Sequence, residues 1–236
     1  MAATPFERRS GVIARLNAAI DEWLRKRSLL ARRILSRRGN RPSPFVLSYL
    51  AGLRGIEIGA SAHNDYGLNA INVDRYGEQD TVYKQEEWRL AGRRRGVDVV
   101  APGDELPFED DAVDFVFASH VLEHFPDPIR ALKEWLRVAR KYVVLVIPHR
   151  DRTFDRDREL TTADELLRRH EQQFEDPRDL HWSVWTLESF LELCDRLGFR
   201  VIDALDPDDK VGNGFALVLD AVPAGGDGAG RVSARE

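Results

Sequence analysis

The sequence contains a single cysteine, Cys194, among its 236 residues. One thiol excludes an internal disulfide framework and leaves no cysteine cluster for a zinc or iron–sulfur site. No apolar run approaches the roughly 18–20 residues that span a bilayer, and the first residues lack the apolar segment of a signal peptide. These absences predict a protein without a transmembrane segment, in the reducing environment of the cytoplasm.

The stretch Arg54–Tyr76, RGIEIGASAHNDYGLNAINVDRY, lacks the closely spaced glycines of a dinucleotide-binding loop. Two strand-like runs flank a turn, and the second run ends on Asp74, an acid that suits a ribose diol. Dinucleotide sites use G-x-G-x-x-G to close backbone amides on a pyrophosphate, but here Gly59 is followed by ASAHNDY and then Gly67. The loop therefore favours an adenosine cofactor without phosphates, such as S-adenosylmethionine.

Charge is unevenly distributed along a chain whose net charge is −5. The segment 7–41 carries eleven basic and three acidic residues, a net charge of +8, with apolar residues spaced by three or four. This pattern predicts basic amphipathic helices. A packing or lid helix with solvated arginines is the favoured interpretation, and recruitment of an anionic partner is the alternative. A nucleic-acid partner is not favoured by the overall charge.

Proline and glycine mark the predicted domain boundaries. The run NRPSP after Gly39 breaks any helix, so residues 1–40 form an appendage and residues 41–222 form the main domain. Within it, helix-like segments alternate with nearly continuous apolar strands, which predicts an α/β fold with a doubly wound, mostly parallel sheet. Residues 150–182 are polar and predict an insertion over the mouth of the sheet. The tail 223–236 is predicted to be disordered.

A series of short motifs runs through the main domain in a characteristic order: IEIGAS, NVD, GDELPF, DFVFASHVLEHFPDP, ALKEWLRVAR and YVVLVIP. Over about residues 45–220 this series resembles the class I S-adenosylmethionine-dependent methyltransferases. The resemblance implies a Rossmann-like sheet of seven strands and an enzyme that transfers a methyl group. It also implies a cofactor site, whose residues by position are Glu57, Gly59, Ala60, Ser61, Asp74, Asp104 and Ser119.

Histidines follow two strands that are adjacent in this fold. Methyl transfer to a hydroxyl needs a base close to the methyl group. His149 ends the run YVVLVIPH and is the first choice for that base, and His120 is the second. A surface histidine without a role is the alternative for His149.

The run HVLEH brings His120, Glu123 and His124 together if it begins a helix, because spacings of three and four share one face. These side chains could hold Mg²⁺ or another divalent cation. Similar clusters occur in metal-dependent relatives, the small-RNA 2′-O-methyltransferases and the ubiquinone-pathway O-methyltransferases, which have glutamate at the position of His120. The alternative is that Glu123 and His124 only cap and brace a helix.

The acceptor is indicated by the run IPHRDRTFDRDRELTT together with GASAHN, which is similar to bacterial methyltransferases found with glycan-assembly enzymes. This resemblance implies a small-molecule or oligosaccharide acceptor methylated on a sugar hydroxyl. The anomeric 1-hydroxyl of a short 3-O-methylated mannoside is the most specific candidate. An RNA 2′-O-methyltransferase, another small-molecule methyltransferase and a catalytically silent binding module are the alternatives. His181, Trp182 and Trp185 form either an aromatic wall for the acceptor or a hydrophobic plug, and a homodimer is compatible with the sequence.

Overall fold

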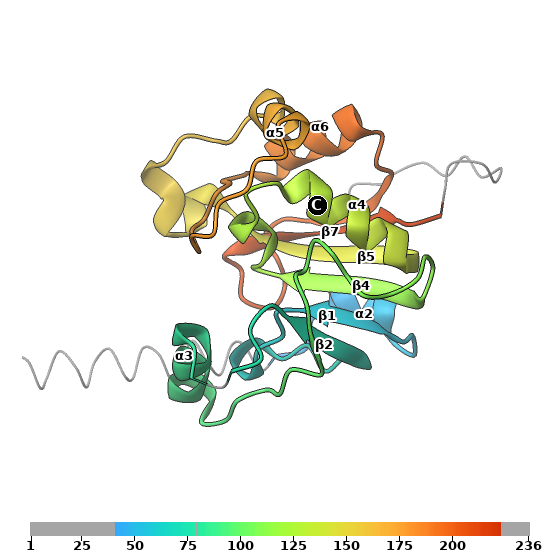
Figure 1. Ribbon diagram of the computed structural model, residues 1–236, viewed down its shortest axis with the longest axis vertical. Coiled ribbons are helices and arrows are strands. Elements are labelled where there is room, and N and C mark those ends of the chain that lie inside the picture. Colours follow the sequence, from blue (N-terminus) through green and yellow to red (C-terminus); the bar gives the residue numbers. More distant parts are fainter. Residues whose placement is uncertain (1–40, 79, 223–236) are drawn as a thin grey trace, which may run out of the picture.

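The computed structural model describes residues 41–78 and 80–222, which contain a seven-stranded sheet in the order β3-β2-β1-β4-β5-β7-β6 (Figure 1). Strand β7 runs antiparallel to both of its neighbours, β5 and β6, and the other pairs are parallel. The strands are β1 Gly55–Ile58, β2 Ala70–Asp74, β3 Val99–Val100, β4 Val113–Ser119, β5 Ala139–Pro148, β6 Val201–Leu205 and β7 Gly214–Asp220. The predicted α/β fold is confirmed. The predicted appendage 1–40 and tail 223–236 lie outside the described residues.

Helices cover both faces of this sheet. The α-helices are α2 Pro44–Leu50, α3 Val82–Ala91, α4 Pro128–Val138, α5 Ala163–Glu171 and α6 Leu187–Leu197. Successive residues of β4 point to opposite faces, so Val116 packs in one core with α4 and α6, while Phe115 and Phe117 pack in another with α2. Both faces of the strands are therefore buried, which explains their continuous apolar runs.

Side-chain caps set where the helices begin. The N-cap residues of α3, α4, α5 and α6 accept a hydrogen bond from a backbone N–H in the first turn, and they are Thr81, Asp127, Thr162 and Thr186. Gly198 ends α6 in the left-handed region with φ 69°, as the sequence predicted. Helix α3 differs from the predicted QEEWRLAGRRR: it begins earlier, at Val82, and stops before Gly92, which has φ 70°.

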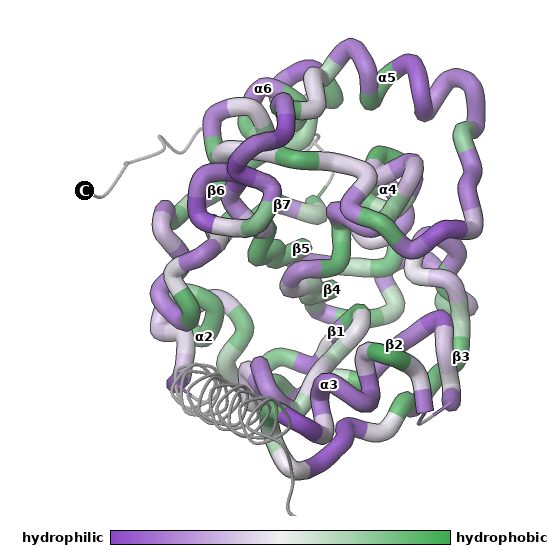
Figure 2. Tube along the Cα trace, turned by 90° about the vertical axis from the view of Figure 1, so that its left-hand side faces the viewer, coloured by the Kyte–Doolittle hydropathy of each residue, from purple (hydrophilic) through white to green (hydrophobic). Residues whose placement is uncertain are grey.

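The insertion 150–182 consists of two short 3₁₀ helices, Arg150–Arg152 and Phe154–Asp157, then α5 and an extended segment. Most residues along α5 are hydrophilic (Figure 2). Leu166 of α5 is nonetheless fully buried in the core that contains Trp185 and Phe190, so the insertion is anchored by apolar contacts. Among the residues that the structure describes, no helix has the length and apolar character needed to cross a bilayer.

Candidate active site

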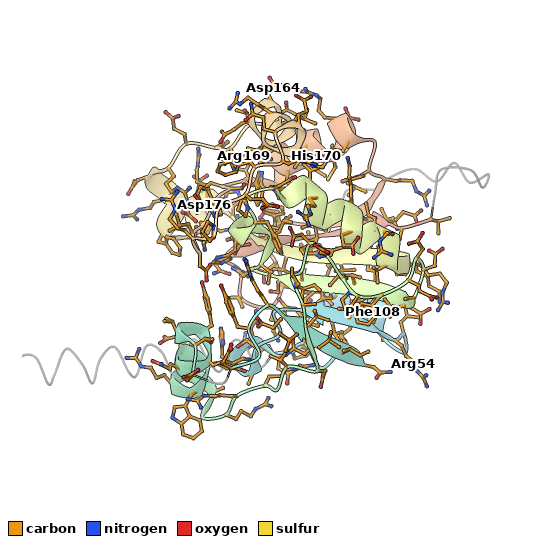
Figure 3. The ribbon with its side chains drawn as sticks, in the orientation of Figure 1. Arg54, Phe108, Asp164, Arg169, His170 and Asp176 are labelled. Atoms are coloured by element: carbon orange, nitrogen blue, oxygen red, sulfur yellow. The ribbon has the colours of Figure 1, made fainter. Side chains whose placement is uncertain are left out.

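A cleft of about 1580 Å³ lies at the carboxyl ends of β1, β2 and β4. Helix α3 contributes residues to it from one side, and the segment after α5 contributes residues from another, including Asp176 (Figure 3). Ligand clefts commonly measure about 300–1,000 Å³. This cleft is therefore large enough for two small ligands side by side.

The loop after β1 has its backbone amides already occupied by protein acceptors. Ala60 N–H donates to Asn72 Oδ1 at 3.0 Å, and Ala62 N–H donates to Glu87 Oε1 at 2.5 Å. Gly59 has φ 66°, and a Cβ there would lie 3.0 Å from Val121 Cγ2. Because the two amides are already bonded, they are not available to a pyrophosphate, in agreement with the exclusion of a dinucleotide made from the sequence.

The side chains that replace the missing glycines contact one another at the cleft wall. Ser61 Oγ and His63 Nδ1 are 2.6 Å apart, and Asn64 Nδ2 donates to Ser119 Oγ at 3.3 Å. Tyr66 OH lies 3.2 Å from the same Ser119 oxygen. Asn64 Oδ1 is buried and has no hydrogen-bond partner, so it can accept a hydrogen bond from a bound ligand.

A buried carboxyl group, Glu57, and a half-buried one, Asp74, lie near the ends of β1 and β2. Burial raises the pKa of Glu57 from 4.5 to about 7, against the opposing charge of Arg95, whose Nη2 lies 3.3 Å from Glu57 Oε2. Burial also raises the pKa of Asp74, although Asp74 Oδ1 accepts the Tyr76 N–H at 2.9 Å. Both groups line the cleft, where each can bind a cationic or hydroxyl-bearing ligand.

Asp104 lies at another part of the cleft wall, with Arg130 Nε 3.5 Å from its carboxylate. The preceding residue, Gly103, accepts a hydrogen bond from Trp135 Nε1 at 2.7 Å, so a buried tryptophan of α4 holds this loop. The structure thus brings all of the sequence-predicted cofactor residues to one cleft: Glu57, Gly59, Ala60, Ser61, Asp74, Asp104 and Ser119.

His149 is placed differently from the expectation for a catalytic base. It is only 7% exposed and is not among the residues that line the cleft. Its Nδ1 accepts the backbone N–H of Asp151 at 3.1 Å, its Nε2 lies 3.9 Å from Asp206, and its ring contacts Phe215 edge-on. These contacts give His149 the role of capping the 3₁₀ helix Arg150–Arg152, and the geometry does not support it as the first choice for base.

His120, the second choice, does line the cleft. It follows β4 with φ 55°, a left-handed conformation that is uncommon for a residue with a side chain and that concentrates at functional sites. The pKa of His120 is lowered to about 4, chiefly by burial; the charge of Asp208 opposes this shift, and the nearby His181 and His124 contribute to it. Its imidazole is therefore neutral at physiological pH and can accept a proton.

The predicted cluster of His120, Glu123 and His124 does not form as a helix face. The 3₁₀ helix covers only Leu122–His124, and His120 lies outside it in its left-handed conformation, so helical spacing does not apply. The group whose ligand atoms approach within 4.8 Å of one another is instead Glu123, His124 and His181. His181 comes from the insertion, and no local spacing in the sequence links it to the other two.

Glu123 is the most unusual member of this group. It is 1% exposed, burial raises its pKa to about 8, and neither of its carboxylate oxygens has a hydrogen-bond partner. His124 Nε2 lies 3.9 Å from Glu123 Oε1, and the His124 and His181 rings are 4.7 Å apart. A buried carboxylate without partners is costly, and a bound cation would satisfy it.

The two tryptophans of the predicted aromatic wall have different surroundings. Trp185 is fully buried and packs on Phe190 at 5.4 Å, so it belongs to the hydrophobic plug. Trp182 is half-buried against Phe174 and lies 5.2 Å from the Arg178 guanidinium. Neither lines the cleft.

Comparison with known proteins identifies the part of the chain that carries most of this cleft. Residues 55–147 match the methyltransferase domain family. These residues form a methyltransferase domain and contain β1 to β4 and all of β5 except Pro148. The whole seven-stranded sheet, which β6 and β7 complete, is that of the class I, S-adenosylmethionine-dependent methyltransferase fold.

Relatives share this domain over part of their length. An uncharacterized methyltransferase of Mycolicibacterium vanbaalenii is 38% identical over 96 residues, which are 38% of this chain and 36% of that protein. An uncharacterized protein of Methanocaldococcus jannaschii is 28% identical over 134 residues, 53% of this chain and 61% of the other. The match therefore spans about a third of the first of these relatives.

A solved structure from Thermotoga maritima shares the fold around the methyltransferase domain. That protein is described as an S-adenosylmethionine-dependent methyltransferase and possible histamine N-methyltransferase. It superposes with a TM-score of 0.50 at 20% sequence identity, covering 86% of this chain and 96% of that one. At this sequence identity, the similarity shows a shared fold.

Proposed function

We propose that the protein is an S-adenosylmethionine-dependent O-methyltransferase that acts on a sugar hydroxyl. The observation that carries this proposal is the shared cleft, in which the cofactor residues, His120 and His124 line one space large enough for two ligands. Methyl transfer to oxygen requires a donor and an acceptor to be held in line, with a base near the acceptor. The cleft offers groups suited to each of these tasks.

Asp74 is suited to accept hydrogen bonds from a ribose diol, and the loop of Gly59, Ala60 and Ser61 lies at the wall where a methionine portion would fit. Glu57 and Asn64 offer acceptor oxygens for an ammonium group: Asn64 Oδ1 has no hydrogen-bond partner, and Glu57 Oε2 makes no hydrogen bond although Arg95 lies 3.3 Å from it. S-adenosylmethionine supplies a methyl group activated by a sulfonium. The residues of this chain hold and orient its ends.

Cofactor affinity should depend on pH through Glu57. The carboxylate attracts an ammonium group only when it is ionised, and its pKa is about 7. We expect the dissociation constant for S-adenosylhomocysteine to fall roughly fivefold to tenfold between pH 6 and 7.5, as the ionised fraction rises. Calorimetric titration checks this, and Glu57→Gln should bind more weakly with a flat pH profile. An unchanged profile in the variant would assign the dependence to another group.

The group Glu123, His124 and His181 fits a divalent cation, because a buried carboxylate with two unpartnered oxygens lies beside two imidazoles. Mg²⁺ was the first cation suggested by the sequence. A bound cation would lower the pKa of an acceptor hydroxyl and orient it. Glu123, His124 and His181 would hold that cation, and His120 would remain outside the set.

His120 is the base that the geometry favours. With a pKa near 4, its imidazole is neutral but weakly basic, so it suits a hydroxyl that is already acidified. An anomeric hydroxyl is more acidic than other sugar hydroxyls, which supports the 1-hydroxyl of a short 3-O-methylated mannoside as the acceptor.

Paired histidine variants should separate the two candidate bases. We expect His120→Asn to lower the turnover of methyl transfer by about 100-fold, the usual contribution of a positioned base. His149→Asn should reduce it far less, because His149 is outside the cleft. Both variants should still bind S-adenosylhomocysteine. Equal losses in the two would overturn the assignment of His120.

The direct test is transfer of a labelled methyl group to a panel of mannosides, other sugars and RNA, with and without a chelator. An RNA 2′-O-methyltransferase is the second candidate, supported by the resemblance of HVLEH to metal-dependent relatives. RNA binding through phosphates weakens steeply with salt, on the order of a thousandfold between 50 and 200 mM for six contacts, whereas sugar binding does not. No labelled product from any acceptor would favour the silent binding module. The cytoplasmic location and a homodimer stay predictions.

A further inference from the structure

Two aspartates of the insertion bind the outward ring nitrogens of the two histidines. Asp155 Oδ2 lies 2.7 Å from His181 Nδ1, and Asp179 Oδ1 lies 2.8 Å from His124 Nδ1. An ionised carboxylate can only accept hydrogen bonds, so each Nδ1 carries the hydrogen. The lone pair of each imidazole is therefore on Nε2, and His124 Nε2 is the atom 3.9 Å from Glu123.

Asp155 is itself held rigidly. It is 2% exposed, and its second oxygen accepts a hydrogen bond from Arg158 Nη1 at 2.7 Å. The same guanidinium donates from Nη2 to the His181 carbonyl at 2.8 Å. Arg158 therefore fixes both the carboxylate and the backbone of the histidine that it orients. A buried aspartate with this one imidazole partner suits the role of setting its tautomer and direction.

We propose that Asp155 is a positioning residue for a transition-metal ion held by Glu123, His124 and His181. The inference rests on the cation site of the proposed function and names the kind of cation. Histidines that bind metals commonly donate their other ring N–H to a carboxylate, which fixes the tautomer and raises ligand basicity. Asp155 and Asp179 give both histidines this arrangement.

The donor set decides between classes of cation. Mg²⁺ prefers an octahedral shell of oxygens and is usually bound through carboxylates, phosphates and water. Imidazole nitrogens suit transition-metal ions such as Zn²⁺ or Co²⁺ better, and the carboxylate beside them also suits Mn²⁺. The site should therefore bind these ions ahead of Mg²⁺, and the insertion provides His181 together with both orienting carboxylates.

Mn²⁺ titration of the full chain, followed by the electron paramagnetic resonance signal of the free ion, tests the proposal. The wild type should bind Mn²⁺, and equimolar Mg²⁺ should not displace it. Asp155→Asn should weaken Mn²⁺ binding by about 10–100-fold. The matched control is Asp157→Asn in the same 3₁₀ helix, because the Asp157 side chain is 92% exposed and the variant should bind like wild type. S-adenosylhomocysteine binding should be retained by both.

A spectroscopic measurement separates positioning from a purely structural role. At saturating Co²⁺, the visible absorption of the bound ion should differ between Asp155→Asn and wild type, because the His181 ring is no longer held by a carboxylate. If Asp155→Asn does not fold, Asp179→Asn carries the same test through His124, since the Asp179 side chain is 36% exposed and tolerates change more readily.

The outcomes are distinct. Failure of the wild type to bind any of the three ions would remove the cation from the proposed function as well. Mn²⁺ binding by wild type with unchanged affinity and Co²⁺ spectrum in both aspartate variants would overturn only the role of Asp155. Displacement of Mn²⁺ by equimolar Mg²⁺ would overturn the selectivity.

Discussion

Replacing Glu123 with glutamine is expected to lower methyl transfer by at least about 100-fold without unfolding the protein. Glutamine has the same shape but only one oxygen and no charge, so it cannot replace a carboxylate ligand. The measurement is turnover with labelled S-adenosylmethionine, alongside Mn²⁺ binding. Glu109→Gln is the matched control, because Glu109 is exposed and lies outside the group of Glu123, His124 and His181. Wild-type turnover in Glu123→Gln would exclude Glu123 from the active site.

The thermal stability of Glu123→Gln should rise, although its methyl-transfer activity should fall. The pKa of Glu123 is raised from 4.5 to about 8, so without a cation the folded protein loses stability as pH rises between these values. The loss is on the order of 5 kcal/mol. Glutamine never ionises. In a chelator at pH 9, Glu123→Gln should therefore unfold at a higher temperature than wild type. A lower unfolding temperature would show that Glu123 stabilises the fold.

Truncating Trp135 is expected to have the largest effect on stability. The side chain is fully buried in the core between α4 and the sheet, and Trp135→Ala should lower the free energy of unfolding by about 3–5 kcal/mol. Trp135→Phe keeps most of the volume but leaves the Gly103 carbonyl without its partner, at a cost of about 1–3 kcal/mol. Denaturant titration checks both values.

Trp88→Ala is the matched control for Trp135, because Trp88 is 55% exposed and lies outside both cores. It should change the free energy of unfolding by less than about 1 kcal/mol. Trp135→Phe should also weaken S-adenosylhomocysteine binding, since Gly103 precedes Asp104 in the cleft wall. Equal destabilisation by Trp88→Ala and Trp135→Ala would contradict the core described for α4.

The fold could be predicted because its determinants are local. Apolar runs such as VDFVFAS mark strands buried on both faces, and threonine or aspartate caps and Gly198 mark helix ends. The residues predicted to bind a cofactor all line one cleft, because the carboxyl ends of adjacent parallel strands meet at one edge. The shortage of glycines in the first loop was interpreted as evidence against a pyrophosphate, and the structure adds a reason that the sequence did not show. Asn72 and Glu87 occupy the amides.

The residues expected near the acceptor were predicted less well, because their positions depend on contacts between segments that are distant in the sequence. His149 was favoured for following a strand, but its side chain caps the next turn and does not line the cleft. His120 was grouped by helical spacing, which its φ of 55° rules out. His181 was expected either in an aromatic wall or in a hydrophobic plug, because nothing near it in the sequence shows that the insertion folds back onto Glu123.

The boundary between the matched domain and the insertion divides the proposed active site into two halves. The family match ends at residue 147, and Asp155, Asp179 and His181 lie beyond it in the insertion. The ring contact between His124 and His181 is where the two halves meet. Under the proposed function, exchange of the single continuous segment 150–182 would therefore change the acceptor chemistry. The strands proposed to hold the cofactor would stay unchanged.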